Sequence, residues 1–246
     1  MSRHYDEFLA PHYTWMFGAS YEDLVREQVE LFRQVDVTGP ADAGTALDLG
    51  CGSGFQSVAL ASLGYRTILA VDASASLLAE LDAHATDWPA IRPMHDDLRA
   101  AVAGIEPGSM ELAVCMGDTL THLPDPAEIG RLFSDLHTAL APGGRLVLTF
   151  RDLARPVAGS DRFILVRSAA DRILTCFLEY APDTVTVHDV LHRRTAPGGD
   201  WTLSASSYQK LRIAPEWVAG QLVAAGFTVD HCGSGPRRMC LVTATR

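Results

Sequence analysis

Short apolar runs typical of strands alternate with longer helical patterns through the first 150 residues of the chain. Strands are predicted at residues 45–50, 66–72, 91–97, 111–117 and 145–150. Helices are predicted at 55–63, at 75–84 behind an N-cap at Ser74, and at 126–140 before Pro142-Gly143-Gly144. Such an alternation is typical of βαβ units, whose strands lie parallel in one sheet.

The pattern changes after Arg151, where four strand-like runs follow one another without a helix between them. These runs lie at 161–167, 173–180, 184–194 and 201–211. A helix at 215–225 and two strands at 227–232 and 239–245 then end the chain. We therefore expect an α/β fold with a Rossmann-like, mostly parallel seven-stranded sheet, a C-terminal antiparallel hairpin, and an antiparallel β insertion after the fifth strand.

One domain over residues 1–246 is expected, because no linker divides the chain. Within it we distinguish four parts: an N-terminal helical segment (1–40), a core (45–150), the antiparallel insertion (157–211), and a closing helix with two strands (215–246).

Charge and cysteine usage limit the classes of partner. The chain has 30 acidic and 20 basic side chains, a net charge of −10, and a single lysine, Lys210. Nucleic-acid binding needs clustered basic side chains, so we expect no nucleic acid as partner. The five cysteines form no CxxC pair and no stretch of 18 apolar residues occurs, so a cytoplasmic protein without a membrane segment is expected. We predict no metal site, because His188 and His192 lack a third ligand nearby.

A glycine loop follows the first predicted strand. Asp48 precedes Gly50, Cys51, Gly52 and Gly54, and glycines let backbone N–H groups approach a ligand closely. Asp72 ends the second strand, 22 residues after Gly50, where a carboxylate can bind a ribose diol. A nucleoside-bearing ligand is indicated. Phe55 stands where a dinucleotide fingerprint has Gly or Ala, which disfavours a nicotinamide or flavin nucleotide.

These segments resemble the motifs of class I S-adenosylmethionine-dependent methyltransferases. The matches are 48–54, Val71-Asp72-Ala73-Ser74 and Pro142-Gly143-Gly144, in that order along residues 45–150. The resemblance implies S-adenosylmethionine as cofactor and S-adenosylhomocysteine as its product. It also implies a set of cofactor-binding residues: Asp48, Gly50, Cys51, Gly52 and Gly54 in the loop, Asp72 and Ala73 at the ribose, Asp97 and Leu98 at the adenine, Met116 beside the methionine part, and Tyr21 at the carboxylate end.

A narrower resemblance concerns the acceptor. Residues 117–125 and Phe150-Arg151-Asp152 are similar to segments of glycine N-methyltransferases, although Asp118 and Asp152 replace asparagines there. The resemblance implies that Arg151 binds an acceptor carboxylate. His122 is the candidate general base and Asp118 the group that orients the acceptor. Loop packing by His122, loop capping by Asp118 and a surface ion pair of Arg151 are the alternatives.

Aromatic residues are dense between Tyr5 and Phe17. In many small-molecule methyltransferases such an N-terminal segment covers the cofactor, and the resemblance therefore implies that residues 1–40 form a lid. Tyr13 and Trp15 are the candidate acceptor-binding walls, since aromatic faces suit cations. Docking of an amphipathic helix on the core is the alternative.

Methyl transfer to a small molecule, by in-line displacement onto an N, O or S acceptor, is the expected function. The acceptor could carry a carboxylate, and the protein could form a homodimer. The sequence leaves two alternatives: a non-catalytic nucleoside-binding subunit, and another enzyme that uses the same donor site.

Overall fold

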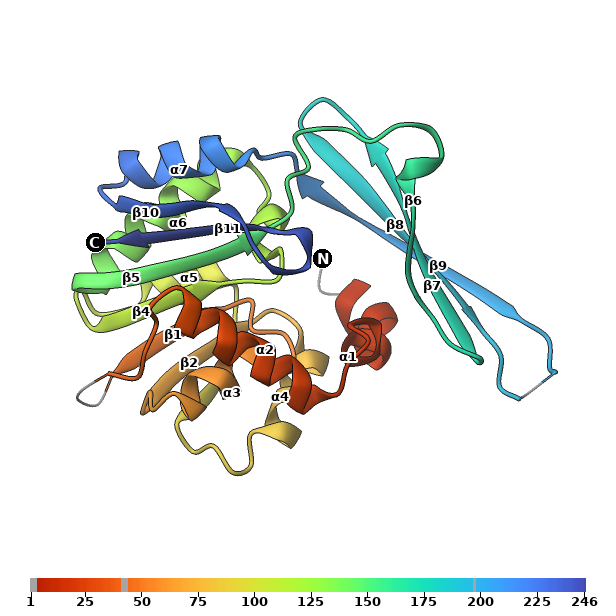
Figure 1. The fold of residues 1–246 in the computed structure, drawn as a ribbon, viewed down its shortest axis with the longest axis horizontal. Helices are drawn as coiled ribbons and strands as arrows, with labels where there is room; N and C mark the ends of the chain where they lie inside the picture. Colours follow the sequence, from red (N-terminus) through yellow and green to blue (C-terminus); the bar gives the residue numbers. More distant parts are fainter. Residues whose placement is uncertain (1–3, 41–43, 197) are drawn as a thin grey trace.

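A seven-stranded sheet forms the centre of the computed structural model, which describes residues 4–40, 44–196 and 198–246 (Figure 1). Its strand order is β10-β11-β5-β4-β1-β2-β3. β1 to β5 run parallel, whereas β11 pairs antiparallel with both β5 and β10. The strands are β1 (Thr45–Leu49), β2 (Thr67–Asp72), β3 (Ile91–His95), β4 (Met110–Cys115), β5 (Leu140–Phe150), β10 (Thr228–Ser234) and β11 (Cys240–Thr245). The predicted mostly parallel sheet and its closing hairpin are confirmed.

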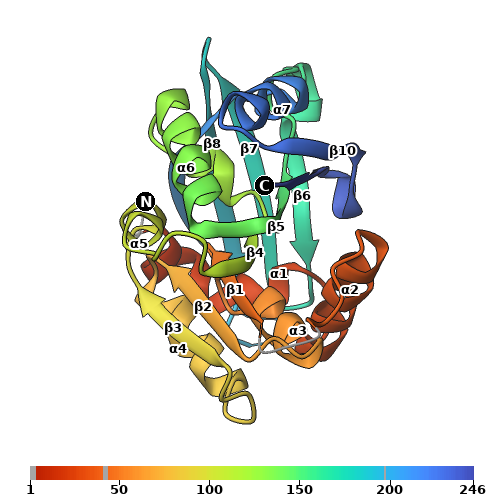
Figure 2. The same cartoon turned by 90° about the vertical axis from the view of Figure 1, so that its left-hand side faces the viewer.

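Helices cover both faces of this sheet (Figures 1 and 2). Side chains alternate along each strand, so Leu47 and Leu49 pack on one face and Ala46 on the other. The first face is covered by α5 (Leu98–Ala103), α6 (Pro126–Ala139) and α7 (Pro215–Ala224), and the second by α2 (Tyr21–Gln34), α3 (Phe55–Ser62) and α4 (Ala75–His84). Both faces of the parallel strands are therefore buried, as their continuous apolar runs predict.

A second, antiparallel sheet is inserted between β5 and α7. Its order is β6-β7-β8-β9, with β6 at Phe163–Ser168, β7 at Arg172–Tyr180, β8 at Thr184–Arg193 and β9 at Thr202–Leu211. The predicted insertion is confirmed. Short N-terminal elements, η1 (His4–Leu9), η2 (Ala10–His12) and α1 (Tyr13–Met16), lie between this sheet and the core (Figure 1).

Two local predictions were wrong. β3 ends at His95, and Asp97 caps the unpredicted helix α5 by accepting a hydrogen bond from Arg99 N at 2.9 Å. β5 begins at Leu140 and includes Pro142-Gly143-Gly144, because Leu140 pairs with Met110 and Arg145 with Leu112. The extra residues between these pairs bulge from the ladder instead of ending a helix. η3 (Thr119–His122), η4 (Gly159–Arg162) and η5 (Pro236–Arg238) complete the described elements.

None of the helices in the described residues has the length and apolar character needed to cross a bilayer. The division of residues 1–246 into lid, core, insertion and closing segment stays a prediction, and residues 1–3, which belong to the expected lid, lie outside the described part of the chain.

Gly54→Ala is expected to lower the free energy of unfolding by about 1–3 kcal/mol. The new Cβ would lie 2.1 Å from Leu81 Cδ1, and the φ of Gly54 is +89°. Gly220→Ala in α7 is the matched control, because its Cβ meets nothing within 4 Å, and alanine stabilises a helix interior by about 0.5–1 kcal/mol over glycine. Urea unfolding measures both changes, and a loss of stability no greater in Gly54→Ala than in Gly220→Ala would contradict the expectation.

Candidate active site

The glycine loop folds tightly over the end of β2. Gly50 N and Cys51 N both donate to Val71 O, at 2.8 and 3.0 Å. Gly50 has a φ of +70°, and a Cβ there would lie 2.3 Å from Thr119 Cγ2. Only glycine fits this position without displacing its neighbour, so the loop backbone itself forms the surface next to Asp72.

Asp72 holds the loop and the start of α4 together. Its Oδ2 accepts from Gly52 N and its Oδ1 from Ser74 N, each at 2.8 Å. A carboxylate oxygen has two lone pairs, so both oxygens can still accept a bond from a ligand. Burial raises the pKa of Asp72, while the backbone donors act against that rise. The carboxylate is thus oriented by the fold before any ligand binds.

Three residues predicted to bind the cofactor instead support the loop from behind. Asp48 is buried and accepts from Ser57 Oγ at 2.6 Å, and its burial raises its pKa to about 7. Gly54 packs on Leu81, and Tyr21 Oη donates to Ser53 O at 2.9 Å. All three lie outside the cavity linings described below, so their cofactor contacts stay predictions.

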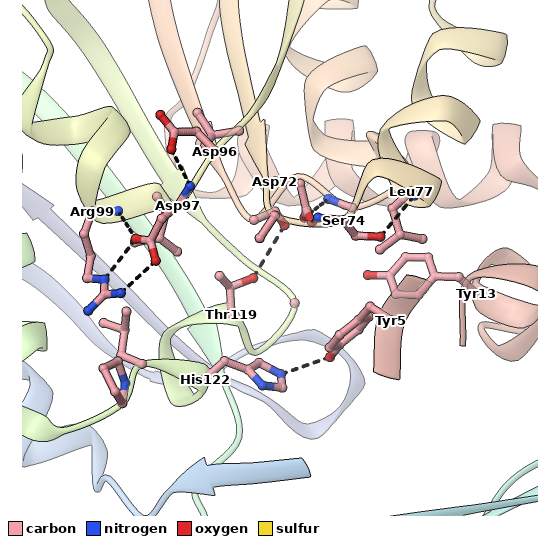
Figure 3. A pocket seen from close by; sticks show the side chains of 18 residues that line it. Tyr5, Tyr13, Asp72, Ser74, Leu77, Asp96, Asp97, Arg99, Thr119 and His122 are labelled. Carbon is pink, nitrogen blue, oxygen red and sulfur yellow. Dashed lines mark hydrogen bonds and ion pairs between the residues drawn. The ribbon is translucent and has the colours of Figure 1, made fainter. Parts of the chain in front are cut away.

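A cavity lies at the carboxyl ends of β1, β2 and β4; we call it the edge cavity (Figure 3). Six predicted cofactor residues line it: Gly50, Gly52, Asp72, Ala73, Asp97 and Leu98. Asp97 is held by the Arg99 guanidinium at 2.7 and 2.9 Å, and the hydrogen bonds from Arg99 lower its pKa. The remaining lining residues are Tyr5, Tyr13, Val71, Ser74, Leu77, Asp96, Arg99, Gly117, Thr119, His122, Leu123 and Pro124.

A second, smaller hollow, the back pocket, continues behind the glycine loop. Cys51 and Met116, both predicted at the cofactor, line it together with Phe17 and Phe55. Gly50, Gly117 and Tyr13 line both the back pocket and the edge cavity. Burial raises the pKa of the Cys51 thiol well above its usual value, so Cys51 is a neutral wall and not a nucleophile.

A third cavity, of about 410 Å³, lies between the core and the antiparallel sheet; we call it the inter-sheet cavity. Its walls are mostly apolar side chains from β6, β7, β8 and the N-terminal elements, such as Leu9, Leu174 and Val187. Tyr5, Tyr13 and Gly117 belong both to this cavity and to the edge cavity. The two spaces are therefore neighbours beside the turn that follows β4.

A buried ion pair joins the two sheets at that turn. Lys210 of β9 donates to Asp118, and both residues are less than a tenth exposed. Asp118 also accepts from Arg151 N at 2.9 Å and from Thr121 Oγ1 at 3.1 Å. Asp118 thus does more than cap its loop, and it faces the inter-sheet cavity as half of an ion pair.

His122 lies beside the N-terminal segment. Its Nε2 is 3.0 Å from Tyr5 Oη (Figure 3). The His122 ring stacks on Tyr208, with centroids 5.3 Å apart. Burial, and then Lys210, lower the pKa of His122 well below its usual value, so the imidazole is neutral near pH 7. It lines the edge cavity but not the inter-sheet cavity.

The predicted acceptor residues have different surroundings. Tyr13 lines all three cavities, and Arg151 lines the inter-sheet cavity with its side chain half exposed. Trp15 lies against the guanidinium groups of Arg167 and Arg172, 5.5 and 5.1 Å from its ring, and lines none of the three. Trp15 therefore fastens the N-terminal segment to the antiparallel sheet, whereas Tyr13 and Arg151 stay candidate acceptor contacts.

Sequence reasoning did not assign a role to Lys210, Tyr5 or Asp189. All three line the inter-sheet cavity. The sequence did offer one hint about Lys210, which is the single lysine of the chain. Lysine is almost never fully buried unless it is paired, so its burial here indicates a specific contact for its charge. No group of three or more His, Cys, Asp or Glu placed to hold a metal occurs in residues 4–40, 44–196 and 198–246.

Lys210→Met is expected to lower the free energy of unfolding by about 3–5 kcal/mol, because Asp118 would remain buried without its cation. The double variant Lys210→Met with Asp118→Asn should recover part of this loss, since it removes both charges and keeps a residue that tolerates the φ of +82° at position 118. Denaturant unfolding of the two variants measures the difference. If the double variant were no more stable than Lys210→Met alone, the unpaired charge of Asp118 would not be the cause of the lost stability.

Comparisons with known proteins agree with this geometry. Residues 46–144 match the family model described as a methyltransferase domain. The chain is 29% identical over 133 residues to a ubiquinone biosynthesis O-methyltransferase from Paraburkholderia xenovorans, which covers 54% of this chain and 55% of the relative. The chain thus spans about half the length of the curated relatives it matches.

Solved structures are similar over nearly the whole chain. The CcbJ methyltransferase from Streptomyces caelestis has a TM-score of 0.75 at 19% identity and covers 98% of this chain and 96% of its own. An amino pentose methyltransferase from Micromonospora echinaspora, solved with bound S-adenosylmethionine, has a TM-score of 0.73 at 20% identity and covers 94% of both chains. At these identities the likeness shows the fold. Residues 46–144 therefore match a methyltransferase domain, and the chain has the fold of these methyltransferase structures.

Proposed function

We propose that this protein transfers the methyl group of S-adenosylmethionine to a small molecule held in the inter-sheet cavity. The observation that carries the proposal is that the edge cavity and the inter-sheet cavity share Tyr5, Tyr13 and Gly117 in their walls. A donor in the first space and an acceptor in the second would approach each other there. In-line displacement needs this alignment more than it needs acid–base groups, because the sulfonium methyl is already activated.

The residues of the edge cavity fit the cofactor. Asp72 presents a pre-oriented carboxylate to a ribose diol, and Asp97 with Leu98 forms the wall proposed for the adenine. The glycine loop and the back pocket, with Cys51 and Met116, would take the amino-acid end. Bound there, S-adenosylmethionine would supply the methyl group.

The N-terminal segment acts as the lid in this proposal. Ser74 Oγ donates to Asp6 Oδ1 at 2.6 Å, and Thr14 Oγ1 donates to Glu80. These contacts tie η1 and α1 to α4, and Tyr5 and Tyr13 thereby cover the point where the two cavities are neighbours. Exclusion of water at this point protects the donor from hydrolysis and strengthens polar contacts with the acceptor.

The inter-sheet cavity favours an acceptor with an apolar or ring-shaped body over a free amino acid. Its walls are largely aliphatic. Its polar side chains include Asp118 in the turn after β4, Asp189 in β8 and Lys210 in β9. The half-exposed Arg151 could still bind a carboxylate on such an acceptor. The names of the relatives, an O-methyltransferase of ubiquinone biosynthesis and an amino pentose methyltransferase, include both oxygen and sugar acceptors. A homodimer and a cytoplasmic location stay predictions.

Asp72→Ala is expected to weaken S-adenosylmethionine binding by about 1–3 kcal/mol, through the lost ribose hydrogen bonds. Calorimetry with S-adenosylmethionine and S-adenosylhomocysteine measures this change. Asp82→Ala, on the exposed side of α4, removes the same charge outside the cavity and should bind as the unmodified protein does. Unchanged binding by Asp72→Ala would contradict the ribose assignment, and absent binding by the unmodified protein would contradict the proposed function.

Methyl-labelled S-adenosylmethionine, offered with a catechol, an amino sugar and glycine, tests the acceptor. We expect label transfer to a ring-bearing acceptor and none to glycine, since the aliphatic cavity would leave glycine's charges poorly solvated. Mass spectrometry of the products identifies the methylated atom. Donor binding without transfer to any of the three would favour the non-catalytic alternative, and release of label without an acceptor would favour donor hydrolysis.

A further inference from the structure

Tyr5 separates His122 from the inter-sheet cavity. Tyr5 lines both the edge cavity and the inter-sheet cavity, whereas His122 lines the edge cavity and a groove beside β9. This groove, the β9 groove, is formed by residues that include His4, Ser206 and Gln209. His122 could therefore not touch an acceptor in the inter-sheet cavity directly, but Tyr5 could.

The Tyr5 hydroxyl and the His122 imidazole form a hydrogen-bonded pair, with Oη 3.0 Å from Nε2. His122 Nδ1 is buried and has no hydrogen-bond partner among the described residues. A neutral imidazole has one protonated and one unprotonated nitrogen, and a hydroxyl donating to Nε2 requires the proton on Nδ1. In this tautomer the unprotonated Nε2 accepts from Tyr5, and the proton is on Nδ1, the ring nitrogen that does not contact Tyr5.

The charged and titratable groups around His122 bear on the charge of the pair. Tyr5 and His4 face it from η1, Tyr208 and Lys210 face it from β9, and Asp118 is paired with Lys210. Burial raises the pKa of Tyr5 and lowers the pKa of His122, so both partners are neutral near pH 7. The Lys210 cation opposes a lasting positive charge on the ring, and would speed the release of a proton that the ring has accepted.

We propose that Tyr5 is a catalytic residue that receives a proton from the methyl acceptor and passes its own proton to His122. This inference rests on the proposed function. As the acceptor atom forms its bond to the methyl carbon, its O–H or N–H bond breaks and the proton moves to Tyr5 Oη. The Tyr5 O–H proton moves to His122 Nε2, and once the product has left, the imidazolium returns this proton to Tyr5 as the Tyr5 hydroxyl gives its own proton to water.

The chain of transfers specifies the acceptor class. It uses an acceptor that must lose a proton, such as a hydroxyl or a neutral primary or secondary amine. A thiolate or a neutral tertiary amine would gain nothing from Tyr5. His122 is the proton-receiving partner that acts through Tyr5, and it does not contact the acceptor.

The first test needs no acceptor. ¹⁵N NMR of histidine-labelled protein, with His122→Gln used to assign the signal, should show His122 protonated on Nδ1 and unprotonated on Nε2. Tyr5→Phe should shift the Nε2 resonance by removing its donor. A proton on Nε2 in the unmodified protein would overturn the proposal, because Tyr5 would then accept from His122 and could not donate to it. Calorimetry with S-adenosylhomocysteine, run on the same samples, tests the donor site separately.

The second test uses the ring-bearing acceptor that the labelling experiment identifies. Tyr5→Phe and His122→Gln should each lower kcat by about 10²-fold or more, with little change in the donor Kd. The double variant should lose no more kcat than either single variant, because the two residues act in series. Tyr65→Phe, which removes a buried hydroxyl outside the site, should leave kcat unchanged. In the unmodified protein, kcat should decrease as the pH is lowered, and only at pH values below 6.5, where His122 becomes protonated. Losses that multiply in the double variant would overturn the serial transfer.

Discussion

The contact between Asp118 and Lys210 decides how the two sheets of this protein sit relative to each other at the site. It joins the turn after β4 to the last residues of β9, which are 92 positions apart in sequence. Removing two charges from water is costly, and such a pair persists only when its geometry and its other hydrogen bonds are satisfied. Asp118 meets that condition through Arg151 N and Thr121 Oγ1. The pair therefore specifies one relative position of core and insertion more than it adds stability.

Gly117 precedes Asp118 in the same turn. Gly117 N donates to Thr149 Oγ1 at 2.9 Å and Asp118 N donates to Thr149 O at 3.1 Å, so the turn is bound to β5 as well as to β9. Gly117 lines the edge cavity, the back pocket and the inter-sheet cavity. A turn held by both β5 and β9 is suited to a point where two bound molecules must be aligned, because small displacements there cost rate.

The two halves of the site differ in how far the sequence predicted them. The glycine loop and Asp72 are local, because the loop follows a strand directly and Asp72 ends the neighbouring parallel strand. Parallel pairing brings these strand ends to one edge, so short-range pattern and topology were enough to place them. Asp48 and Gly54 belong to the same segment, yet Asp48 accepts from Ser57 and Gly54 packs on Leu81, so both support the loop from behind. Motif spacing does not reveal which face of a loop a side chain occupies.

The acceptor side was less predictable, because contacts between segments far apart in sequence create it. Tyr5 meets His122 across 117 positions, and His4 meets Asp189 of β8 at 3.2 Å. Trp15 and Tyr13 are two residues apart, but only Tyr13 turns toward the cavities, while Trp15 contacts Arg167 and Arg172. Periodicity predicted the strands that carry Asp189, Arg167 and Arg172, but not η1, α1 and η3, which carry the other residues of these contacts. It carried no information on which of them would meet.

By itself, the amino-acid sequence determined the α/β fold, the order of the strands along the chain, and the sheet edge where the glycine loop and Asp72 lie, since apolar periodicity, glycine loops and strand-end acids act over a few residues. The tertiary structure decided the walls of the inter-sheet cavity, the partner of the single lysine, and the placement of Tyr5 between His122 and that cavity. These features depend on the docking of the antiparallel sheet and the N-terminal segment onto the core. That docking results from many small apolar contacts and one buried ion pair, and no short motif encodes their sum.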